Sequence, residues 1–345
     1  MGALEETITM SHGAGGKAMH KLIEEVILAA FSSENTRLAS MEDQARMDLA
    51  DFHHYGDRLA FTTDSYVVDP LFFPGGDIGK LAVTGTINDL AVGGATPLYM
   101  SCSFILEEGL PIETLKRVVQ SMQQTAERAD VQIVTGDTKV VPRGACDKLF
   151  ITTTGIGVIR QDSNIQANRA ELGDVVIVNG YLGDHGAAIA DARGELALEN
   201  TIETDCCALN ELISSMLDVC PDIHCMRDVT RGGLITVLNE FAQASECGIV
   251  VEETSLPIRK QVRGMCEILG LDPLYLANEG KLVAIVPAAN AQDVLNVMQE
   301  NDAGKHAAII GKVVASERRQ VLLTTSFGTQ RIADVLVGDQ LPRIC

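Results

Sequence analysis

Five aspartates stand at the ends of short apolar runs or beside glycine and threonine. Carboxylates gathered at one edge of a sheet are hard oxygen ligands that can hold Mg²⁺ bound to a nucleotide. Each aspartate alone could equally cap a turn or a helix, so the hypothesis depends on the group. The five are Asp43 in MEDQA, Asp64 in FTTDSY, Asp89 in INDLAVGG, Asp137 in VTGDTK and Asp228 in MRDVTRGG.

A glycine-rich segment, SHGAGGKAMH, precedes an amphipathic helical pattern. It is not a P-loop, because Ala18 follows Lys17 where a hydroxyl should bind Mg²⁺, and Ser11 takes the place of the first glycine. The free N–H groups at the start of the helix could still hold an anion. A disordered N-terminal arm is the alternative interpretation.

Cys345 is the last residue of the sequence, where little can bury it. A thiolate attacks activated carbonyls and later leaves readily, which suits a covalent carrier. The stretch from Gly338 to Cys345 can span at most roughly 28 Å, so the thiol could move between two sites. A frayed tail that happens to end in cysteine is the alternative.

Charge and cysteine content exclude several classes of protein. Lys plus Arg number 27 and Asp plus Glu number 47, so a net charge of −20 argues against nucleic acid as a partner. Neither a secretory signal nor an apolar run long enough to cross a membrane is visible. Nine cysteines, an odd number, indicate reduced thiols in the cytoplasm. Cys206, Cys207, Cys220, Cys225 and His224 could form a zinc site, but core packing explains them better.

The elements that must position these residues mix strands and helices without strict alternation, which favours an α+β fold with helices on mixed sheets. A polar stretch, RQDSNIQANRAELGD, separates the two halves. Asp77 is expected to cap a helix that Gly93 and Gly94 end. Expected helices lie at 22–31, 78–92, 111–126, 184–193, 205–219, 229–246, 258–269 and 290–300, and expected strands at 58–64, 98–106, 131–138, 149–159, 175–180, 249–253, 281–287, 307–314 and 320–326.

Four ordered motifs resemble the ATP-binding superfamily of aminoimidazole ribonucleotide synthetase and selenophosphate synthetase. They are FTTDSYVVDP, GTINDLAVGGATPLYMS, VTGDTKVV and MRDVTRGGLITVLNE, and the terminal PRIC narrows the resemblance to the HypE family of hydrogenase maturation carbamoyl dehydratases. The resemblance implies a two-domain fold and a homodimer through the N-terminal sheet. The expected divisions are an arm and helix at 1–40, an ATP-binding domain at 41–160, an α+β domain at 161–336 and a flexible tail at 337–345.

In that family the terminal thiol is a carrier. The carbamoyltransferase HypF places a carbamoyl group on it, and ATP drives the removal of water to leave a thiocyanate. The HypC–HypD complex then accepts the cyanide for the iron of the hydrogenase. The resemblance therefore implies that Cys345 is the carrier in this chain and that ATP and Mg²⁺ are the cofactors.

The dehydration needs charge neutralisation for phosphate and a base for nitrogen. Asp43, Asp64, Asp89 and Asp137 are expected to organise Mg²⁺ and phosphate. Lys139 could bind phosphate or assist proton transfer, and Glu279 in LANEGK is the candidate base, although exposed salt bridges would explain both equally well. Lys17 and His12 could close the glycine-rich arm over the phosphates.

Other functions stay open at this point. A selenophosphate synthetase is disfavoured because the glycine-rich stretch of that family carries the reactive cysteine, and SHGAGGK has none. Aminoimidazole ribonucleotide synthetase and thiamine monophosphate kinase would not need a terminal thiol. A non-catalytic thiol carrier or scaffold is the alternative from a different class.

Overall fold

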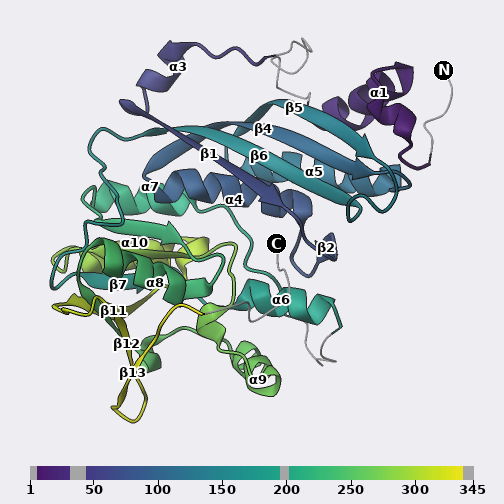
Figure 1. The fold of residues 1–345 in the computed structure, drawn as a ribbon. Coiled ribbons are helices and arrows are strands. Elements are labelled where there is room, and N and C mark those ends of the chain that lie inside the picture. Colours follow the sequence, from purple (N-terminus) through teal and green to yellow (C-terminus); the bar gives the residue numbers. More distant parts are fainter. Residues whose placement is uncertain (1–5, 32–43, 195–201, 337–345) are drawn as a thin grey trace.

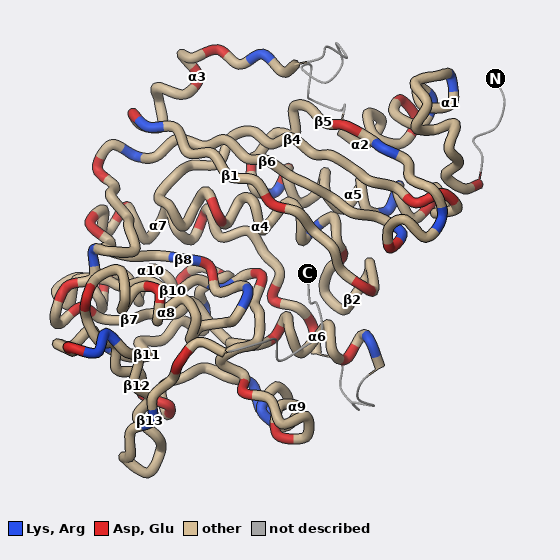
Figure 2. Tube along the Cα trace, in the orientation of Figure 1, with Lys and Arg blue, Asp and Glu red and all other residues tan. Residues whose placement is uncertain are grey.

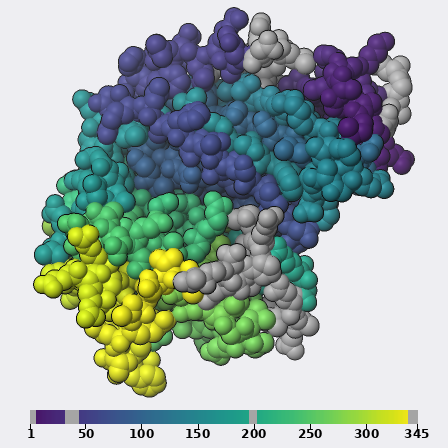
Figure 3. Space-filling model, in the orientation of Figure 1, coloured from purple at the N-terminus to yellow at the C-terminus, as the bar shows by residue number. Residues whose placement is uncertain are grey.

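The structure is a computed structural model that describes residues 6–31, 44–194 and 202–336. Asp43, Cys345 and the predicted tail at 337–345 lie outside the described residues. The described chain forms two halves, each a sheet with packed helices. The N-terminal half lies above the C-terminal half in the ribbon and in the space-filling view (Figures 1 and 3). The expected α+β class is confirmed.

A four-stranded sheet forms the N-terminal half, in the order β1-β6-β4-β5. β6 is antiparallel to both neighbours, whereas β4 and β5 are parallel. Exposure alternates along β1, so one face of the sheet is packed and the other is open. The strands are β1 (Arg58–Tyr66), β4 (Ala95–Glu107), β5 (Gln132–Val141) and β6 (Leu149–Ile159), with a small β2 (Phe72–Phe73) and β3 (Gly76–Asp77) hairpin beside them.

Helices α4 (Ile78–Val92) and α5 (Ile112–Arg128) cover the packed face (Figure 1). Asp77 caps α4 as predicted, because its carboxylate accepts the N–H groups of Gly79 and Lys80. α4 is buried on nearly all sides, because the sheet lies on one side of it and the C-terminal half on the other. A helix in that place can present polar residues to the junction between the halves.

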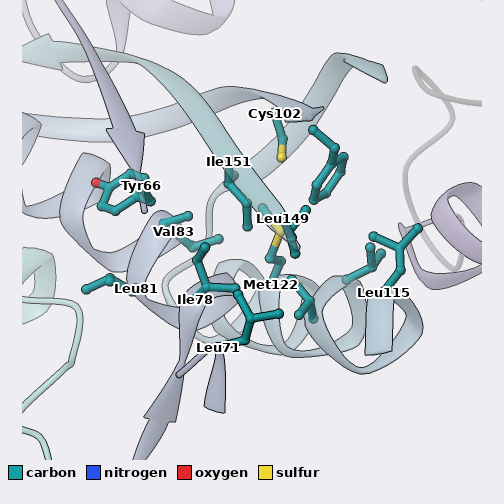
Figure 4. Close-up of a cluster of buried hydrophobic side chains, with 14 of the residues drawn as sticks. Tyr66, Leu71, Ile78, Leu81, Val83, Cys102, Leu115, Met122, Leu149 and Ile151 are labelled. Carbon is teal, nitrogen blue, oxygen red and sulfur yellow. The ribbon is translucent and has the colours of Figure 1, made fainter. Parts of the chain in front are cut away.

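The core of the N-terminal half lies between this sheet and its two helices (Figure 4). Ile78 and Leu81 of α4, Leu115 of α5 and Leu149 of β6 are fully buried. Burying each such side chain stabilises the fold by about 1.5–3 kcal/mol relative to exposure. The packed core therefore fixes the position of α4 against the sheet that contains β1.

A seven-stranded sheet forms the C-terminal half, in the order β13-β12-β9-β11-β7-β10-β8. All neighbours are antiparallel except β9 and β12, which are parallel. Its strands are β7 (Val175–Val178), β8 (Cys225–Asp228), β9 (Gly248–Glu252), β10 (Leu282–Val286), β11 (Ala308–Val314), β12 (Val321–Thr324) and β13 (Gln330–Ile332). Its helices are α6 (Asp184–Ala192), α7 (Asn210–Val219), α8 (Gly233–Ala244), α9 (Lys260–Leu269) and α10 (Ala291–Glu300).

The described part of the N-terminal arm packs on the sheet rather than being disordered. The backbone N–H of Ile8 donates to Leu110, and Ile8 is fully buried. Gly13 lies so close to Val140 of β5 that a Cβ on it would come within 2.9 Å of the valine Cβ. The arm contains η1 (Met10–Gly13), α1 (Lys17–Leu22), the π-helical turn η2 (Ile23–Leu28) and α2 (Ala29–Phe31), and the short α3 (Leu49–His53) follows further along the chain.

Most predicted elements are present, with two informative differences. Helix α7 begins at Asn210 rather than at residue 205, because Asp205 uses its side chain to bind backbone N–H groups elsewhere. Strand β8 was missed because CMRD is short and shows no alternation of apolar and polar residues. Strand β8 lines the site described below, and Asp205 lines a second cavity.

No helix among residues 6–31, 44–194 and 202–336 has the length and apolar character needed to cross a membrane. The eight cysteines of the described chain are all free thiols. Cys206, Cys220 and Cys225 are buried, as the core interpretation of these residues requires. No group of three or more His, Cys, Asp or Glu side chains in these ranges could hold a metal ion by itself, so the zinc interpretation has no support here.

Candidate active site between the two halves

A cavity of about 390 Å³ lies where α4 and β1 face β8 and the turn that follows β8. Its size falls in the range of small-molecule sites. Acidic and basic positions gather where α4 faces β8 (Figure 2). Its lining includes Asp64, Tyr66, Asp89, Arg227, Asp228, Arg231 and Glu279. Three of the predicted site residues, Asp64, Asp89 and Glu279, are therefore brought together.

Asp64 and Asp89 are held by threonines of the opposite element. The Thr86 hydroxyl on α4 donates to Asp64 Oδ2 at 2.9 Å, and the Thr62 hydroxyl on β1 donates to Asp89 Oδ2 at 3.0 Å. Thr86 and Asp89 are three residues apart on α4 and so share a face of the helix. This exchange of hydrogen bonds fixes both carboxylates at the cavity wall.

The two carboxylates repel one another in a place with little water. Burial raises the pKa of Asp89, and the negative charge of Asp64 raises it further. A divalent cation beside them would reverse this balance, because its charge favours the ionised form of both groups. Mg²⁺ is usually bound by one or two carboxylates together with phosphates and water. Asp64 and Asp89 therefore fit a nucleotide-bound Mg²⁺ although no all-protein metal cluster exists in the described ranges.

Asp228 ends β8 and faces the same cavity. Burial raises its pKa to about 7, and the charge of Asp89 adds to the effect. Arg227 and Arg231 supply the positive charge of this wall. Their charges partly offset the upward shift of the Asp89 pKa that burial and Asp64 cause. Arginine binds phosphate oxygens in a bidentate manner, so the wall can face an anionic ligand. Neither arginine was predicted as a site residue, although both stand in the MRDVTRGG motif.

Glu279 is 5% exposed and lines the cavity from the C-terminal half. Its backbone carbonyl accepts a hydrogen bond at 3.4 Å from Asn88 of α4, which also donates to the carbonyl of Cys207. Asn88 thus joins the two halves directly beside Asp89. The sequence reasoning passed over Asn88, whose only signal was its place in the INDLAVGG motif.

The predicted aspartate group is not assembled in one place, because Asp137 and Asp64 point to opposite faces of the sheet. Through β6 and β4, Asp64 is in register with Gly136, whereas Asp137 is in register with Ser65. Strands β1 and β5 are three spacings apart, about 14 Å, so the two carboxylates cannot share one ion within a chain. The four-aspartate grouping is corrected on this point, and Asp43 lies outside the described residues.

Lys139 lies with Asp137 on the open face, where its Nζ is 2.9 Å from the carboxylate. The lysine side chain is 66% exposed and the aspartate side chain 54% exposed. Lys17 is also exposed at the start of α1. His12 is buried, and its Nδ1 accepts the backbone N–H of Thr9 at 3.0 Å. These four residues lie on β5 or on the arm that packs beside it, away from the Asp64–Asp89 pair.

Comparison with known proteins identifies the family of the chain. Family models described as AIR synthase related protein match residues 41–159 with the N-terminal domain and residues 171–323 with the C-terminal domain. The carbamoyl dehydratase HypE of Rhodobacter capsulatus is 56% identical over the full length of both chains. That of Escherichia coli is 53% identical over 98% of this chain and 99% of its own.

Two solved structures are also informative. A HypE protein in complex with ATP matches with a TM-score of 0.92 and 48% identity, over 98% of this chain and all of its own. A HypE–HypF complex matches with a TM-score of 0.79 and 44% identity, over 91% of this chain and 99% of its own. Fold and family models thus define a protein class with two AIR synthase-like domains. Within that class, the chain belongs to the HypE family of carbamoyl dehydratases, the family that acts in hydrogenase maturation.

Proposed function

We propose that this chain removes water from a carbamoyl group carried on the thiol of Cys345, using ATP, and leaves a thiocyanate that supplies cyanide to the iron of nickel–iron hydrogenase. The observation that carries the proposal is the cavity that joins Asp64, Asp89 and Glu279 at the boundary of the two halves. A HypE relative of 48% identity binds ATP. Cys345 lies outside the described residues, so its role is part of the proposal.

The chemistry divides into two balanced steps. The thiocarbamate oxygen attacks the γ-phosphorus of ATP, ADP leaves, and the nitrogen loses one proton to give a phosphorylated imidate. The nitrogen then loses its second proton as the carbon–oxygen bond breaks, which releases phosphate and forms the nitrile. The protein must hold the phosphates and accept protons from nitrogen.

We assign these tasks to the residues of the cavity. Asp64 and Asp89 would hold the Mg²⁺ that accompanies ATP, which would neutralise charge on the phosphates. Glu279 is the base for nitrogen, because it is a buried carboxylic acid residue that lines the same cavity. Tyr66 lines the same cavity as the two aspartates and Glu279. Its phenol keeps its proton because burial and the charge of Asp64 raise its pKa. It can therefore donate a hydrogen bond but cannot serve as the base.

We propose in addition that a second copy covers the open face of the N-terminal sheet. Leu59 is 62% exposed and Phe61 is 71% exposed on this face, which is unusual for large apolar residues of a sheet. Asp137 and Lys139 share the face with them. Their proposed roles in binding Mg²⁺ and phosphate, and those of Lys17, His12 and Asp43, therefore refer to the dimer. Phe61→Asp should convert a dimer into a monomer in light scattering, and an unchanged mass would reject this interface.

The proposed partners follow from the same chemistry. HypF supplies the carbamoyl group, and a HypE relative of 44% identity forms a complex with HypF. The HypC–HypD complex is the proposed acceptor of cyanide. The nine cysteines of the sequence favour the reducing cytoplasm as the compartment.

The test is the mass of the tail peptide after incubation with HypF and its carbamoyl donor, with and without ATP. We expect the peptide to gain a carbamoyl group first and to lose one water only when Mg-ATP is present. Cys345→Ala is the control and should show neither change. Binding of ATP without loss of water would instead support a non-catalytic carrier.

A further inference from the structure

The backbone of Glu279 is held by a buried aspartate from a distant part of the chain. The Asp205 Oδ1 accepts the N–H of Glu279 at 3.0 Å, and Oδ2 accepts the N–H of Gly280 at 3.3 Å. One carboxylate thus binds two consecutive N–H groups. On the other side, Asn88 donates to the carbonyl of Glu279, so the peptide unit is held from both sides.

Asp205 is itself fixed by a buried lysine. The Lys281 Nζ lies 3.2 Å from Asp205 Oδ2 and also donates to the carbonyl of Gly280 at 3.1 Å. The Asp205 side chain is 3% exposed and the Lys281 side chain is 10% exposed. The charge of Asp205 raises the pKa of Lys281 against the effect of burial, so the lysine stays positive. A buried ion pair adds little net stability, so we attribute to this pair a role in fixing the geometry of the segment.

The segment held in this way borders two cavities. Glu279 lines the cavity that contains Asp64 and Asp89. Asp205 and Lys281 line a second cavity of about 400 Å³ together with Cys207. A segment with a cavity on each side has fewer packing contacts to fix it, so the polar bonds must do so. Gly280 permits the close approach, because a Cβ there would collide with the backbone carbonyl of Asp205.

We propose that Asp205, held by Lys281, is a positioning residue for the dehydration, and that it keeps the Glu279 carboxylate directed into the cavity where the thiocarbamate is to react. This inference rests on the proposed role of Glu279 as the base. Asp205 acts through the backbone of Glu279 and touches no reacting atom. A shift of about 1 Å in a catalytic group can slow a reaction on the order of a hundredfold.

The test uses a variant that removes both charges and keeps both shapes, Asp205→Asn with Lys281→Met. Its matched control is Asp184→Asn with Arg259→Met. That pair also lines the second cavity, with Arg259 Nε 2.9 Å from Asp184 Oδ2, and neither residue has a hydrogen bond to the 278–281 segment among those of the described chain. All proteins are full-length and are carbamoylated with HypF. The rate of water loss is then followed in a single turnover at saturating Mg-ATP.

We expect the Asp205/Lys281 variant to lose water about 10–100-fold more slowly, with Mg-ATP affinity close to that of the parent. The control pair should retain the parent rate. Glu279→Gln alone should be slower still, and adding the Asp205/Lys281 changes to it should slow the reaction little further, because residues that act as a unit are not additive. The pH profile of the slow variant should also shift, since its base is displaced.

Three results would overturn the inference: a parent rate in the Asp205/Lys281 variant, losses that multiply with Glu279→Gln, or an equal loss in the control pair. Should the double variant fold poorly, Asp205→Asn alone replaces it, because it keeps the shape and removes one acceptor. A parent rate for Glu279→Gln would reject the proposed base itself. A slow Glu279→Gln variant together with a parent rate in the Asp205/Lys281 variant would instead reject only the positioning role of Asp205.

Discussion

Asp64 and Asp137 stand on the two edge strands of one sheet and were expected to act together, yet their surroundings differ in every respect. Asp64 faces α4, accepts a hydrogen bond from Thr86 and lies near Asp89 in a cavity. Asp137 faces outward and pairs only with its neighbour on the strand, Lys139, among its described ion pairs. One position of strand register separates the two environments.

The two faces of the sheet differ in how they affect the pKa values of their carboxyl groups. Burial and the charges of neighbouring carboxylates raise the pKa values of Asp89 and Asp228, as is common at functional sites. The pKa of Asp137 is lowered, chiefly by its hydrogen bond with Lys139. We therefore expect substitutions on the packed face to change chemistry and metal binding strongly. The same substitutions on the open face should have small effects unless a second copy covers it.

The largest effect is expected for Glu279→Gln. Loss of a general base typically slows a reaction about 10²–10⁴-fold, and the single-turnover rate of water loss should fall by that amount. Carbamoylation of the tail and affinity for Mg-ATP should stay near the parent values. Glu113→Gln is the control, because Glu113 is exposed on α5 with a side chain 74% accessible. A parent rate would place the base elsewhere, with Lys139 of the open face as the next candidate.

Asp228 should make the packed face sensitive to pH. Its pKa is about 7 in the folded protein against an ordinary value of 3.8, so the folded state holds a proton that the unfolded chain releases in this window. The free energy of unfolding therefore falls as pH rises from about 4 to 7. From pH 5 to pH 8 the loss should be about 3 kcal/mol.

Denaturant unfolding in EDTA at several pH values measures this effect. Asp228→Asn should flatten the profile, and Asp137→Asn, on the open face, should leave it unchanged in this window. Parallel curves for parent and Asp228→Asn would show that the Asp228 carboxyl has an ordinary pKa.

Binding of Mg-ATP distinguishes the two faces most directly. Asp64→Asn removes a formal charge from the proposed metal site, and we expect affinity to fall about 10–50-fold in calorimetry, or on the order of 1.4–2.3 kcal/mol. Asp137→Asn should change affinity much less in a monomeric chain. An equal loss in both variants would mean that the working site spans both faces, which only a second copy can bring about.

The smallest effect is expected for the exposed Asp137–Lys139 pair itself. The pKa of Asp137 is lowered, so the stability that the pair provides is present near neutral pH and is lost as pH falls through that lowered value. Solvent screens such pairs, and removing this one should change the free energy of unfolding by about 0.5 kcal/mol or less. A larger change at pH 7, or one that resists high salt, would show that the face is covered.

Several parts of the fold could be predicted from local sequence alone. Asp77 marks the start of α4 because its carboxylate caps free N–H groups, and the Gly93–Gly94 pair marks the end because Gly94 has a positive φ of 79° that favours glycine. Leu115, Val118 and Met122 define the buried face of α5 by their spacing. Such signals depend on interactions among a few neighbouring residues, so they can be recognised without knowledge of the rest of the chain.

The composition of the site depended on contacts that local patterns do not contain. Asp205 meets Glu279 across 74 positions of sequence, and Asn88 meets it across 191. No spacing rule connects such residues, and both resemble ordinary loop or helix positions when read singly. Asp228 was recognised by its motif, but the strand that carries it was not.

The sequence by itself determined the α+β class, the family and the acidic residues available for binding Mg²⁺, because composition, periodicity and ordered motifs are local properties. Only the tertiary structure decided which of those residues meet. Side chains alternate between the faces of a strand, so register places Asp64 inside and Asp137 outside. The packing of α4 between two sheets then brings Asp89 beside Asp64 and places Asn88 against Glu279. Register and packing are set by the whole core, which no single segment encodes.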